Sequence, residues 1–371
     1  MFHVVCVAAA RPNFMKVKPV LDALEALGTR TTLVHTGQHY DPQMSDVFFE
    51  DLGLRQPDHR LGVGSGSHAA QTAGVMVAFE TLLTELKPDA VVVVGDVNST
   101  MACAIVAAKA GCLVAHVEAG LRSRDWDMPE EVNRVVADRV SDLLFAPSQD
   151  AVDNLRSEGY RADQVRLVGN VMIDTLLANL PRAHALNVPH RFDLPSNYGV
   201  VTLHRPSNVD DPVVLRRLLE ALGQVSTEIP LLFSVHPRTA AHLEGMGTPP
   251  GISLVEPLGY LDFLGLQASA AIVLTDSGGI QEETTALGTP CLTLRENTER
   301  PITITHGTNQ LVGTDPTRIV EGARRVLQAG VEPRCPSLWD GNAGARIAES
   351  IKESLSNNTR LRPTDTPSRS L

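Results

Sequence analysis

The sequence predicts an α/β protein of two domains, each built around a parallel β-sheet. Strand-like apolar runs alternate with helical patterns. In this order each helix carries the chain back across the sheet, so the next strand runs parallel to the one before it. Some runs, such as the four valines at 91–94, are apolar at every position, which is typical of parallel strands buried on both faces. The alternation stops near 171–197 and then restarts. A chain of 371 residues is long enough for two domains.

Residues 1–170 are expected to form the first domain. Two helical segments, "MKVKPVLDALEALG" and "STMACAIVAAKAG", end at Gly28 and Gly111, a usual helix stop. A third, "PEEVNRVVADRVSD", begins with Pro129, which suits the first position of a helix. Its apolar face is predicted to consist of Val132, Val135, Val136 and Val140. Strands are predicted at 3–9, 31–36, 91–95, 112–117, 143–146 and 165–168.

The second half repeats the pattern after a connecting segment. Residues 171–197 contain three prolines and no strand signal, so we expect a linker there. Residues 198–340 are expected to form the second domain, followed by a terminal helix at 341–355 that returns toward the first domain. The tail, 356–371, lacks apolar periodicity and is expected to be disordered. Strands are predicted within 198–205, 230–238, 252–257, 270–279 and 290–296.

Composition and charge narrow the functional class. The net charge of −11 argues against nucleic acid or an anionic membrane surface as a partner, so an anionic substrate must meet a local group of cations. The five cysteines form no CxxC pair, which favours reduced core residues in a cytoplasmic protein. Neither a signal peptide nor a membrane-spanning run is expected. The glycine-rich "LGVGSGSH" follows no strand, so a dinucleotide loop is not expected there.

Titratable residues follow four of the predicted strands. Ligands of open α/β sheets bind beyond the carboxyl ends of the strands, so several such residues together favour an active cleft. Each residue taken singly could instead cap a helix or bond within a loop. These residues are Asp96, Glu118, His204 and Asp276.

The stretch "DSGGIQEETTALG" at 276–288 predicts a phosphate site. A buried strand breaks at Ser277, Gly278 and Gly279, and a helix is expected from Ile280 to Gly288. Glycines let a ligand approach the backbone, and free amides at a helix start attract anions. Glu282 and Glu283 are expected in the first turn, where acids favour the helix dipole or one of them could bond ribose hydroxyls.

Further charged residues would complete such a site. Glu130, at the start of the Pro129 helix, is expected to project toward Asp96 and Glu118, or else to pair with Arg134. Arg11, Lys16 and Arg300 are cations placed to meet a diphosphate, although single exposed cations are usually solvated. A metal at Asp96, Glu118 and Glu130 lacks an obvious further ligand, so no metal is expected.

These residues resemble one family, the non-hydrolysing UDP-N-acetylglucosamine 2-epimerases. The resemblance runs in order from residue 4 to about residue 350. It is carried by "ARPNFMK", "TGQHYDPQMSDVFFEDLG", "GDVNST", "HVEAGLRSRDWDMPEEVNR", "HRPSNVDDP", "LTDSGGIQEE" and "NTERP". It implies a GT-B-like fold of two Rossmann-like domains facing a cleft, no cofactor, and a cytoplasmic homodimer. It also implies interconversion of UDP-N-acetylglucosamine and UDP-N-acetylmannosamine through 2-acetamidoglucal, as a step toward surface polysaccharides.

The resemblance also implies roles for individual residues. Asp96, Glu118 and Glu130 would be the acid/base set, and His204 would assist the leaving diphosphate. Phe263 would lie by the uracil, with main-chain groups of Leu258 nearby. The positions implied to bind UDP are Arg11, Lys16, Ser277, Gly278, Gly279, Glu283 and Arg300.

The sequence departs from the family pattern in three places. Ala9 and Ala10 precede the Arg-Pro pair, and Val97 follows Asp96, where other residues are frequent. The stretch "TGQHYDPQM" is longer than the "QHRxM" version of members that their own substrate activates. A second substrate site involving Gln38, Gln43 and His236 is therefore not predicted.

Three alternative functions remain open at this stage. One is an epimerase of a UDP-diacetamido-uronic acid, although "TERP" stands here where such relatives tend to carry "TEW". Another is a GT-B glycosyltransferase, which would need an acceptor. The third is a non-catalytic UDP-sugar sensor, which would have no need of the three carboxylates.

Overall fold

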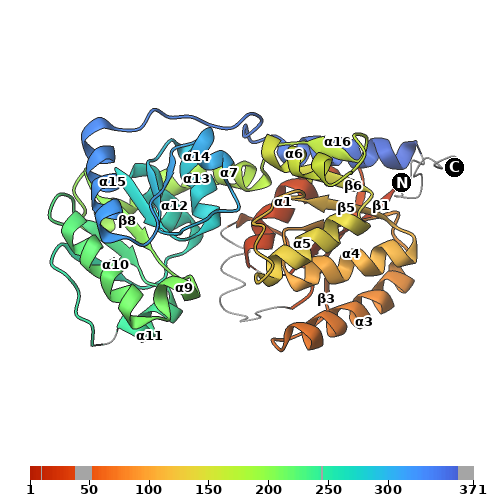
Figure 1. Cartoon of the computed structure of the whole chain (residues 1–371). Coiled ribbons are helices and arrows are strands. Elements are labelled where there is room, and N and C mark those ends of the chain that lie inside the picture. The colour runs from red at the N-terminus through yellow and green to blue at the C-terminus, as the bar shows by residue number, and fades with distance from the viewer. Residues whose placement is uncertain (10, 38–51, 244, 358–371) are drawn as a thin grey trace, which may run out of the picture. The chain divides into compact units, whose positions relative to one another are not determined.

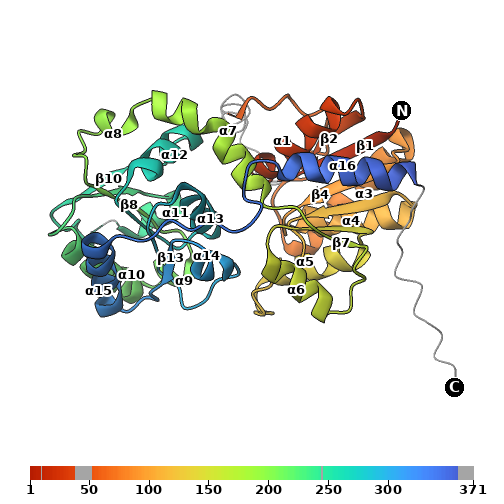
Figure 2. The same cartoon turned by 90° about the horizontal axis from the view of Figure 1, so that it is seen from above.

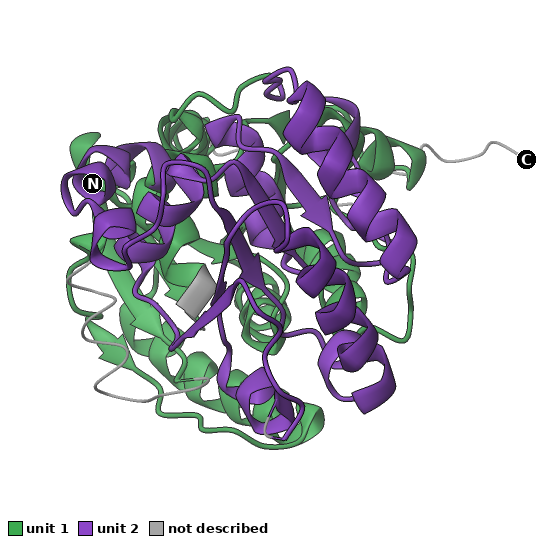
Figure 3. Ribbon diagram, turned by 90° about the vertical axis from the view of Figure 1, so that its left-hand side faces the viewer, with its two compact units in different colours: residues 1–175, 337–371 green, residues 176–336 purple. Residues whose placement is uncertain are grey.

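The computed structural model describes residues 1–9, 11–37, 52–243 and 245–357 (Figure 1). The side chains of Arg11 and Pro12 lie outside this description. The chain divides into two compact units, coloured separately in Figure 3. Unit 1 comprises Met1–Thr175 and Ser337–Leu371, and unit 2 comprises Leu176–Pro336. Each unit contains one parallel sheet flanked by helices, so the predicted α/β class with two Rossmann-like domains is confirmed.

The sheet of unit 1 has seven strands in the order β3-β2-β1-β4-β5-β6-β7. All described pairings in it are parallel, and β4 lies between β1 and β5. The strands β1, β4 and β5 are buried along their whole length, which explains their runs of apolar residues. The strands are β1 His3–Ala8, β2 Arg30–His35, β3 His59–Arg60, β4 Ala90–Val94, β5 Leu113–Val117, β6 Leu143–Ala146 and β7 Val165–Leu167.

The helices of unit 1 lie on both faces of its sheet. Helices α3, α4 and α5 pack side by side in one layer. Helix α16 lies along α1, as Figure 2 shows, and Asp174 accepts hydrogen bonds from the first amides of α16, Ala343 N at 3.1 Å and Gly344 N at 2.7 Å. The helices are α1 Arg11–Ala26, α3 His68–Leu86, α4 Asn98–Ala110, α5 Pro129–Val140, α6 Gln149–Ser157, the start of α7 Val171–Ala185, and α16 Ala343–Ser356.

The sheet of unit 2 has six parallel strands in the order β10-β9-β8-β11-β12-β13. Strands β8 and β11 pair in the middle, with Thr202 opposite Thr275. The strands are β8 Gly199–Thr202, β9 Leu231–Ser234, β10 Ile252–Val255, β11 Ile272–Thr275, β12 Cys291–Thr293 and β13 Asn309–Leu311. The helices are the rest of α7, α8 Val188–Arg191, α9 Pro206–Val209, α10 Pro212–Val225, α11 Pro237–Leu243, α12 Tyr260–Ser269, α13 Gly278–Leu287, α14 Ile302–Thr305 and α15 Pro316–Ala329.

Each unit has its own hydrophobic core. In unit 1 the valines of β1, β4 and β5 pack against α3 and α4, with Phe79 fully buried among them. In unit 2 the strands pack against α10 and α15. Burial of each large apolar side chain contributes roughly 1.5–3 kcal/mol, so both sheets are firmly held. In the part of the chain that the structure describes, no helix is both long and apolar enough to cross a membrane.

The strand orders place a topological switch point in each sheet. The order reverses between β1 and β4 in unit 1 and between β8 and β11 in unit 2. Chains leaving two such neighbouring strands turn to opposite faces of the sheet, which opens a crevice at their carboxyl ends. Lys16 and Asp96 follow the first pair of strands, and His204 and Ser277 follow the second.

Several local expectations differ from the structure. Most of the expected linker 171–197 is helical, in α7 and α8, because Pro181 sits inside a continuous helix rather than ending it. Unit 2 accordingly begins at Leu176 and ends at Pro336 rather than spanning 198–340. The short edge strands β3 and β13 were not predicted. Of the tail 356–371, Ser356 ends α16 and all residues after Asn357 lie outside the described part.

The largest difference concerns α5. The predicted apolar face of this helix is not its most buried face: Val132 is 38% exposed, and Val135, Val136 and Val140 are only half-buried. The residues of α5 that are buried are instead mostly polar: Glu131, Asn133, Arg134, Ala137 and Asp138. The helix therefore turns a polar face toward the ends of β4 and β5, where partners for these groups are found.

Candidate active site

In unit 1, the turn after β4 brings several predicted residues together. Gly95 has a φ of +70°, which favours glycine. A Cβ at this position would lie 3.1 Å from both Asn13 Nδ2 and Lys16 Nζ, and 3.5 Å from Glu118 Oε2. Asn13 also donates to Val94 O at 3.1 Å. The side chains of α1 and the residue after β5 therefore crowd over this turn, and Asp96 follows it directly.

Glu118 and Lys16 form an ion pair in which both side chains are largely buried. Glu118 follows β5 and has a φ of +73°, an uncommon value for a residue with a side chain. Strained backbone of this kind is frequent at functional sites. The amide of Glu118 donates to Phe145 O at 3.1 Å, so β6 helps to hold the residue in this conformation. Two residues that the sequence singled out separately are thus in contact.

Asp96 is held by α5. Its carboxylate lies 2.6 Å from Arg134 Nη2, and its side chain remains 29% exposed. Its main-chain oxygen accepts a hydrogen bond from Asn133 Nδ2 at 2.9 Å. Arg134 is at the same time 2.5 Å from Glu131, three residues before it in the helix. The sequence allowed a pair between Arg134 and Glu130, but in the structure Arg134 pairs with Glu131 of the same helix.

The two remaining candidates of unit 1 are Glu130 and Arg11. Glu130 lies in the first turn of α5 and is exposed to solvent. Arg11 is the first residue of α1, but its side chain lies outside the described part of the structure.

A buried network beneath the β4 turn was not predicted. His116 of β5 lies 2.8 Å from Gly95 O through Nε2 and 2.6 Å from Asp138 through Nδ1. Burial would raise the pKa of Asp138, but hydrogen bonds from His116 and the charge of Arg122, 2.7 Å away, hold it below its usual value. Both ring nitrogens of His116 face acceptors, so the ring links the carboxylate of Asp138 to the main chain of the β4 turn. Sequence periodicity gives no signal for such a network, because its members come from separate elements.

In unit 2, Asp276 organises the ends of β8 and β11. This buried carboxylate accepts hydrogen bonds from the amides of His204 and Arg205, at 3.0 Å and 2.9 Å, and from Asn208 Nδ2 at 3.2 Å. It also lies 3.0 Å from His204 Nδ1. Burial opposes its ionisation, but His204 and the amides lower the pKa of Asp276. The His204 ring, partly exposed, is thereby oriented with Nε2 on the side opposite Asp276.

The SGG turn lies beside His204 in the strand order of unit 2. Helix α13 begins at Gly278, two residues earlier than expected, because Ser277 is extended and both glycines adopt helical angles. The first amides of such a helix have no partner within the helix and point toward any anion at its start. A Cβ on Gly278 would lie 2.9 Å from Glu299 Oε1 and 3.0 Å from Arg300 Nη1, so any larger residue would have to displace this ion pair.

Arg300 reaches the SGG turn from the loop after β12. Its guanidinium lies 3.0 Å from Glu282 and 2.9 Å from Glu299. Burial would raise the pKa of Glu299, but Arg300, Arg295 and Arg205 hold it far below its usual value. Glu282 lies in the second turn of α13, not in the first as expected, and it is a partner of Arg300 rather than of the helix dipole.

Glu283 is also buried in the second turn of α13. Burial raises its pKa to about 7, and the nearby charge of Glu282 contributes, although a hydrogen bond from Gln267 opposes the rise. Burial, together with the negative charge of Glu283, raises the pKa of Tyr260 far above its usual value. Glu283 is therefore a carboxyl group that gains and loses its proton near neutral pH.

Phe263 and Leu258 lie in one partly exposed apolar cluster. Both pack against a buried cluster that includes Tyr198 and Val200, as does Ile280 of α13. The two predicted residues and the first turn of α13 thus border the same cluster. Among the residues that the structure describes, no group of three or more His, Cys, Asp or Glu side chains is arranged to hold a metal ion.

Comparison with known proteins shows the family of the chain. The sequence profile described as UDP-N-acetylglucosamine 2-epimerase matches residues 22–352. The chain belongs to this family. The UDP-N-acetylglucosamine 2-epimerase of Methanococcus maripaludis is 39% identical over 363 residues, covering 95% of this chain and 98% of that protein. The UDP-2,3-diacetamido-2,3-dideoxy-D-glucuronate 2-epimerase of Pseudomonas aeruginosa is 39% identical over 350 residues, covering 93% and 98%.

Solved structures of the family share the fold. The crystal structure of the Methanocaldococcus jannaschii UDP-GlcNAc 2-epimerase, in complex with UDP-GlcNAc and UDP, aligns with a TM-score of 0.85 at 39% identity. The alignment covers 95% of this chain and 100% of the Methanocaldococcus jannaschii chain. The resemblance to the epimerase family is thus confirmed, and with it the classification of this chain as an isomerase.

Proposed function

We propose that this chain epimerises UDP-N-acetylglucosamine and UDP-N-acetylmannosamine reversibly at carbon 2 of the sugar. The observation that carries the proposal is the clustering of Asp96 and Glu118 at the ends of two neighbouring strands in a member of this family. Inversion needs proton donors and acceptors for both faces of one carbon, and a set of carboxylates can supply them.

The proposed reaction proceeds by elimination and re-addition. A carboxylate takes the carbon-2 proton as the carbon-1–oxygen bond to UDP breaks, which leaves 2-acetamidoglucal and UDP. Carbon 2 is then protonated on the opposite face, and a diphosphate oxygen of UDP rebonds to carbon 1. The candidate acid/base residues are Asp96, Glu118 and Glu130. Lys16 holds the Glu118 carboxylate in place in this scheme, because the two side chains pair.

Unit 2 is proposed to hold UDP. The amides of Gly278 and Gly279 would donate hydrogen bonds to the diphosphate, and Arg300 lies against the same turn. Ser277 would contribute its hydroxyl group, because its amide already donates to Thr275 Oγ1 at 3.0 Å. His204, oriented by Asp276, would protonate or hydrogen-bond the leaving diphosphate. Glu283 would bond the ribose, while Phe263 and Leu258 would contact the uracil. Arg11 and Lys16 would add positive charge for the diphosphate.

Proton NMR in deuterated water tests the reaction. We expect the purified chain, given UDP-N-acetylglucosamine and no cofactor, to produce the manno epimer with deuterium at carbon 2. Absence of both product and label would refute the proposal. Asp96→Asn and Glu118→Gln are expected to abolish turnover while UDP still binds. Turnover retained in either variant would remove that residue from the mechanism.

A second candidate substrate is a UDP-diacetamido-uronic acid. It is favoured by the Pseudomonas aeruginosa relative, which at 39% identity is as similar to this chain as the Methanococcus maripaludis UDP-N-acetylglucosamine 2-epimerase is. The "TERP" sequence at 298–301 favours the simpler sugar. Direct competition between the two substrates at equal concentration would decide, because the preferred one has the higher kcat/KM.

We also propose the setting in which the enzyme works. A homodimer in the cytoplasm that supplies UDP-N-acetylmannosamine to surface polysaccharide synthesis is consistent with the family. Light scattering would test the dimer, since a mass near 39.9 kDa would indicate a monomer. Deletion in the source organism should reduce mannosamine-containing surface polysaccharide, and an unchanged polysaccharide would contradict the role.

A further inference from the structure

We propose that Arg134, itself held by Glu131, is the positioning residue that orients the Asp96 carboxylate. This inference rests on the proposed function, in which Asp96 handles the carbon-2 proton. Arg134 lies between two carboxylates, with Nη1 2.5 Å from Glu131 Oε2 and Nη2 2.6 Å from Asp96 Oδ2. A guanidinium is planar and rigid, so fixing one of its nitrogens on Glu131 directs the other at Asp96.

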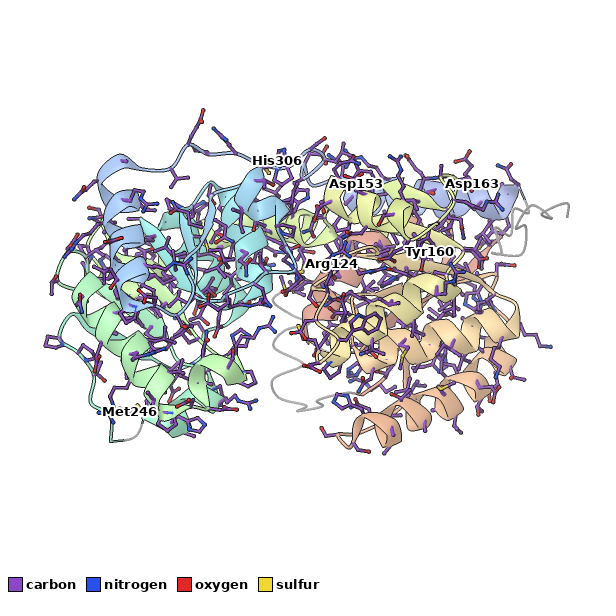
Figure 4. All side chains as sticks on the ribbon, viewed as in Figure 1. Arg124, Asp153, Tyr160, Asp163, Met246 and His306 are labelled. Atoms are coloured by element: carbon purple, nitrogen blue, oxygen red, sulfur yellow. The ribbon has the colours of Figure 1, made fainter. Side chains whose placement is uncertain are left out.

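Glu131 is fixed in turn by the loop that precedes α5. Its two oxygens accept hydrogen bonds from Ser123 N and Arg124 N, both at 2.9 Å, and from Ser123 Oγ at 3.0 Å. Arg124, labelled in Figure 4, has a φ of +59°, so this loop is held in an uncommon conformation. Burial would raise the pKa of Glu131, but these donors and Arg134 keep it below its usual value. Glu131 is therefore an ionised, immobile support.

The main chain around Asp96 is held in the same way. His116 bonds the oxygen of Gly95 at 2.8 Å, and Asn133 bonds the oxygen of Asp96 at 2.9 Å. With Arg134 on the carboxylate, both the backbone and the side chain of Asp96 have partners from α5, while β5 holds the residue before it. The carboxylate still remains 29% exposed, so it can meet a ligand.

Stability alone does not account for this arrangement. Burying a charged pair removes both ions from water, and an apolar pair of similar size is often as stable or more so. Helix α5 carries valines that could have packed inward, yet Val132 is 38% exposed while the Arg134 side chain is 3% exposed. The orientation of α5 thus fixes the position of the Asp96 carboxylate at the expense of an apolar contact.

Kinetics of Arg134 variants test the proposal in the full-length enzyme. We expect Arg134→Ala to lower kcat by about 100-fold, since a misplacement of about 1 Å at a reacting group can have that effect. The affinity for UDP should stay within about twofold, because Arg134 contacts Asp96 and Glu131 and is not among the residues proposed to bind UDP. Added guanidinium ions should restore part of kcat by occupying the vacated space. Arg134→Lys should fold well and show an intermediate loss of about tenfold, since lysine keeps the charge but not the fork.

The matched control is Arg139→Ala, which removes an exposed arginine from the same helix and should leave kcat unchanged. The proposal is overturned if kcat of either Arg134 variant stays within about threefold of this control. It is equally overturned if the loss in Arg134→Ala comes with loss of UDP affinity and no response to guanidinium, which would indicate a folding role. An inactive wild-type chain would instead refute the proposed function, which separates the two failures.

Discussion

Glu283→Gln is expected to stabilise the protein at alkaline pH and to have little effect at acid pH. Burial and the charge of Glu282 raise the pKa of Glu283 from 4.5 to about 7. Well below pH 4.5 this carboxyl is protonated in both the folded and the unfolded chain, so its burial does not lower the free energy of unfolding through ionisation. As pH rises toward 7 the unfolded chain loses the proton first, and the folded state loses stability. The difference between the two pKa values corresponds to about 3 kcal/mol above pH 7.

Gln keeps the shape and the acceptor for Gln267 but cannot ionise. The gain should therefore be small at pH 5 and approach about 3 kcal/mol at pH 8. For a unit of this size, that raises the unfolding midpoint of unit 2 by about 6–12 °C at pH 8. Both tryptophans lie in unit 1, so circular dichroism or calorimetry is the better probe. Glu220→Gln, at an exposed position of α10, is the control. A gain for Glu283→Gln that is equal at pH 5 and pH 8 would refute the reasoning.

Three further substitutions test the local geometry. Gly95→Ala, at a φ of +70°, should lower the free energy of unfolding by about 1–2 kcal/mol and lower kcat at least tenfold. Urea unfolding and steady-state kinetics measure the two effects, and wild-type turnover would contradict a crowded catalytic turn. Gly278→Ala should weaken UDP binding in calorimetry, because its Cβ would lie 2.9 Å from Glu299; unchanged affinity would argue against a phosphate site there. Arg122→Ala leaves Asp138 buried without its arginine and should lower the free energy of unfolding by about 3–5 kcal/mol. A loss under 1 kcal/mol would show that water takes the place of the guanidinium.

Sequence alone determined the parts that depend on local pattern. Continuous apolar runs such as that of β4 gave the parallel sheets, since only strands covered on both faces tolerate them. Strand ends are visible where such runs stop, so Asp96, Glu118 and His204 could be placed at the carboxyl edges. Gly-containing motifs marked the turn before α13 in the same way, although the helix starts two residues earlier than its apolar pattern suggests.

Only the tertiary structure decided which groups meet. Periodicity shows which residues of α5 share a face, but it cannot show which face turns inward when the partners are far along the chain. Arg134 and Asp96 are 38 residues apart, and the ion pair between them exists because β4 and β5 are neighbours in the sheet. The protonation of Glu283 near neutral pH was equally beyond the sequence. It results from desolvation inside unit 2, and desolvation depends on what surrounds a group in space rather than on its neighbours in the chain.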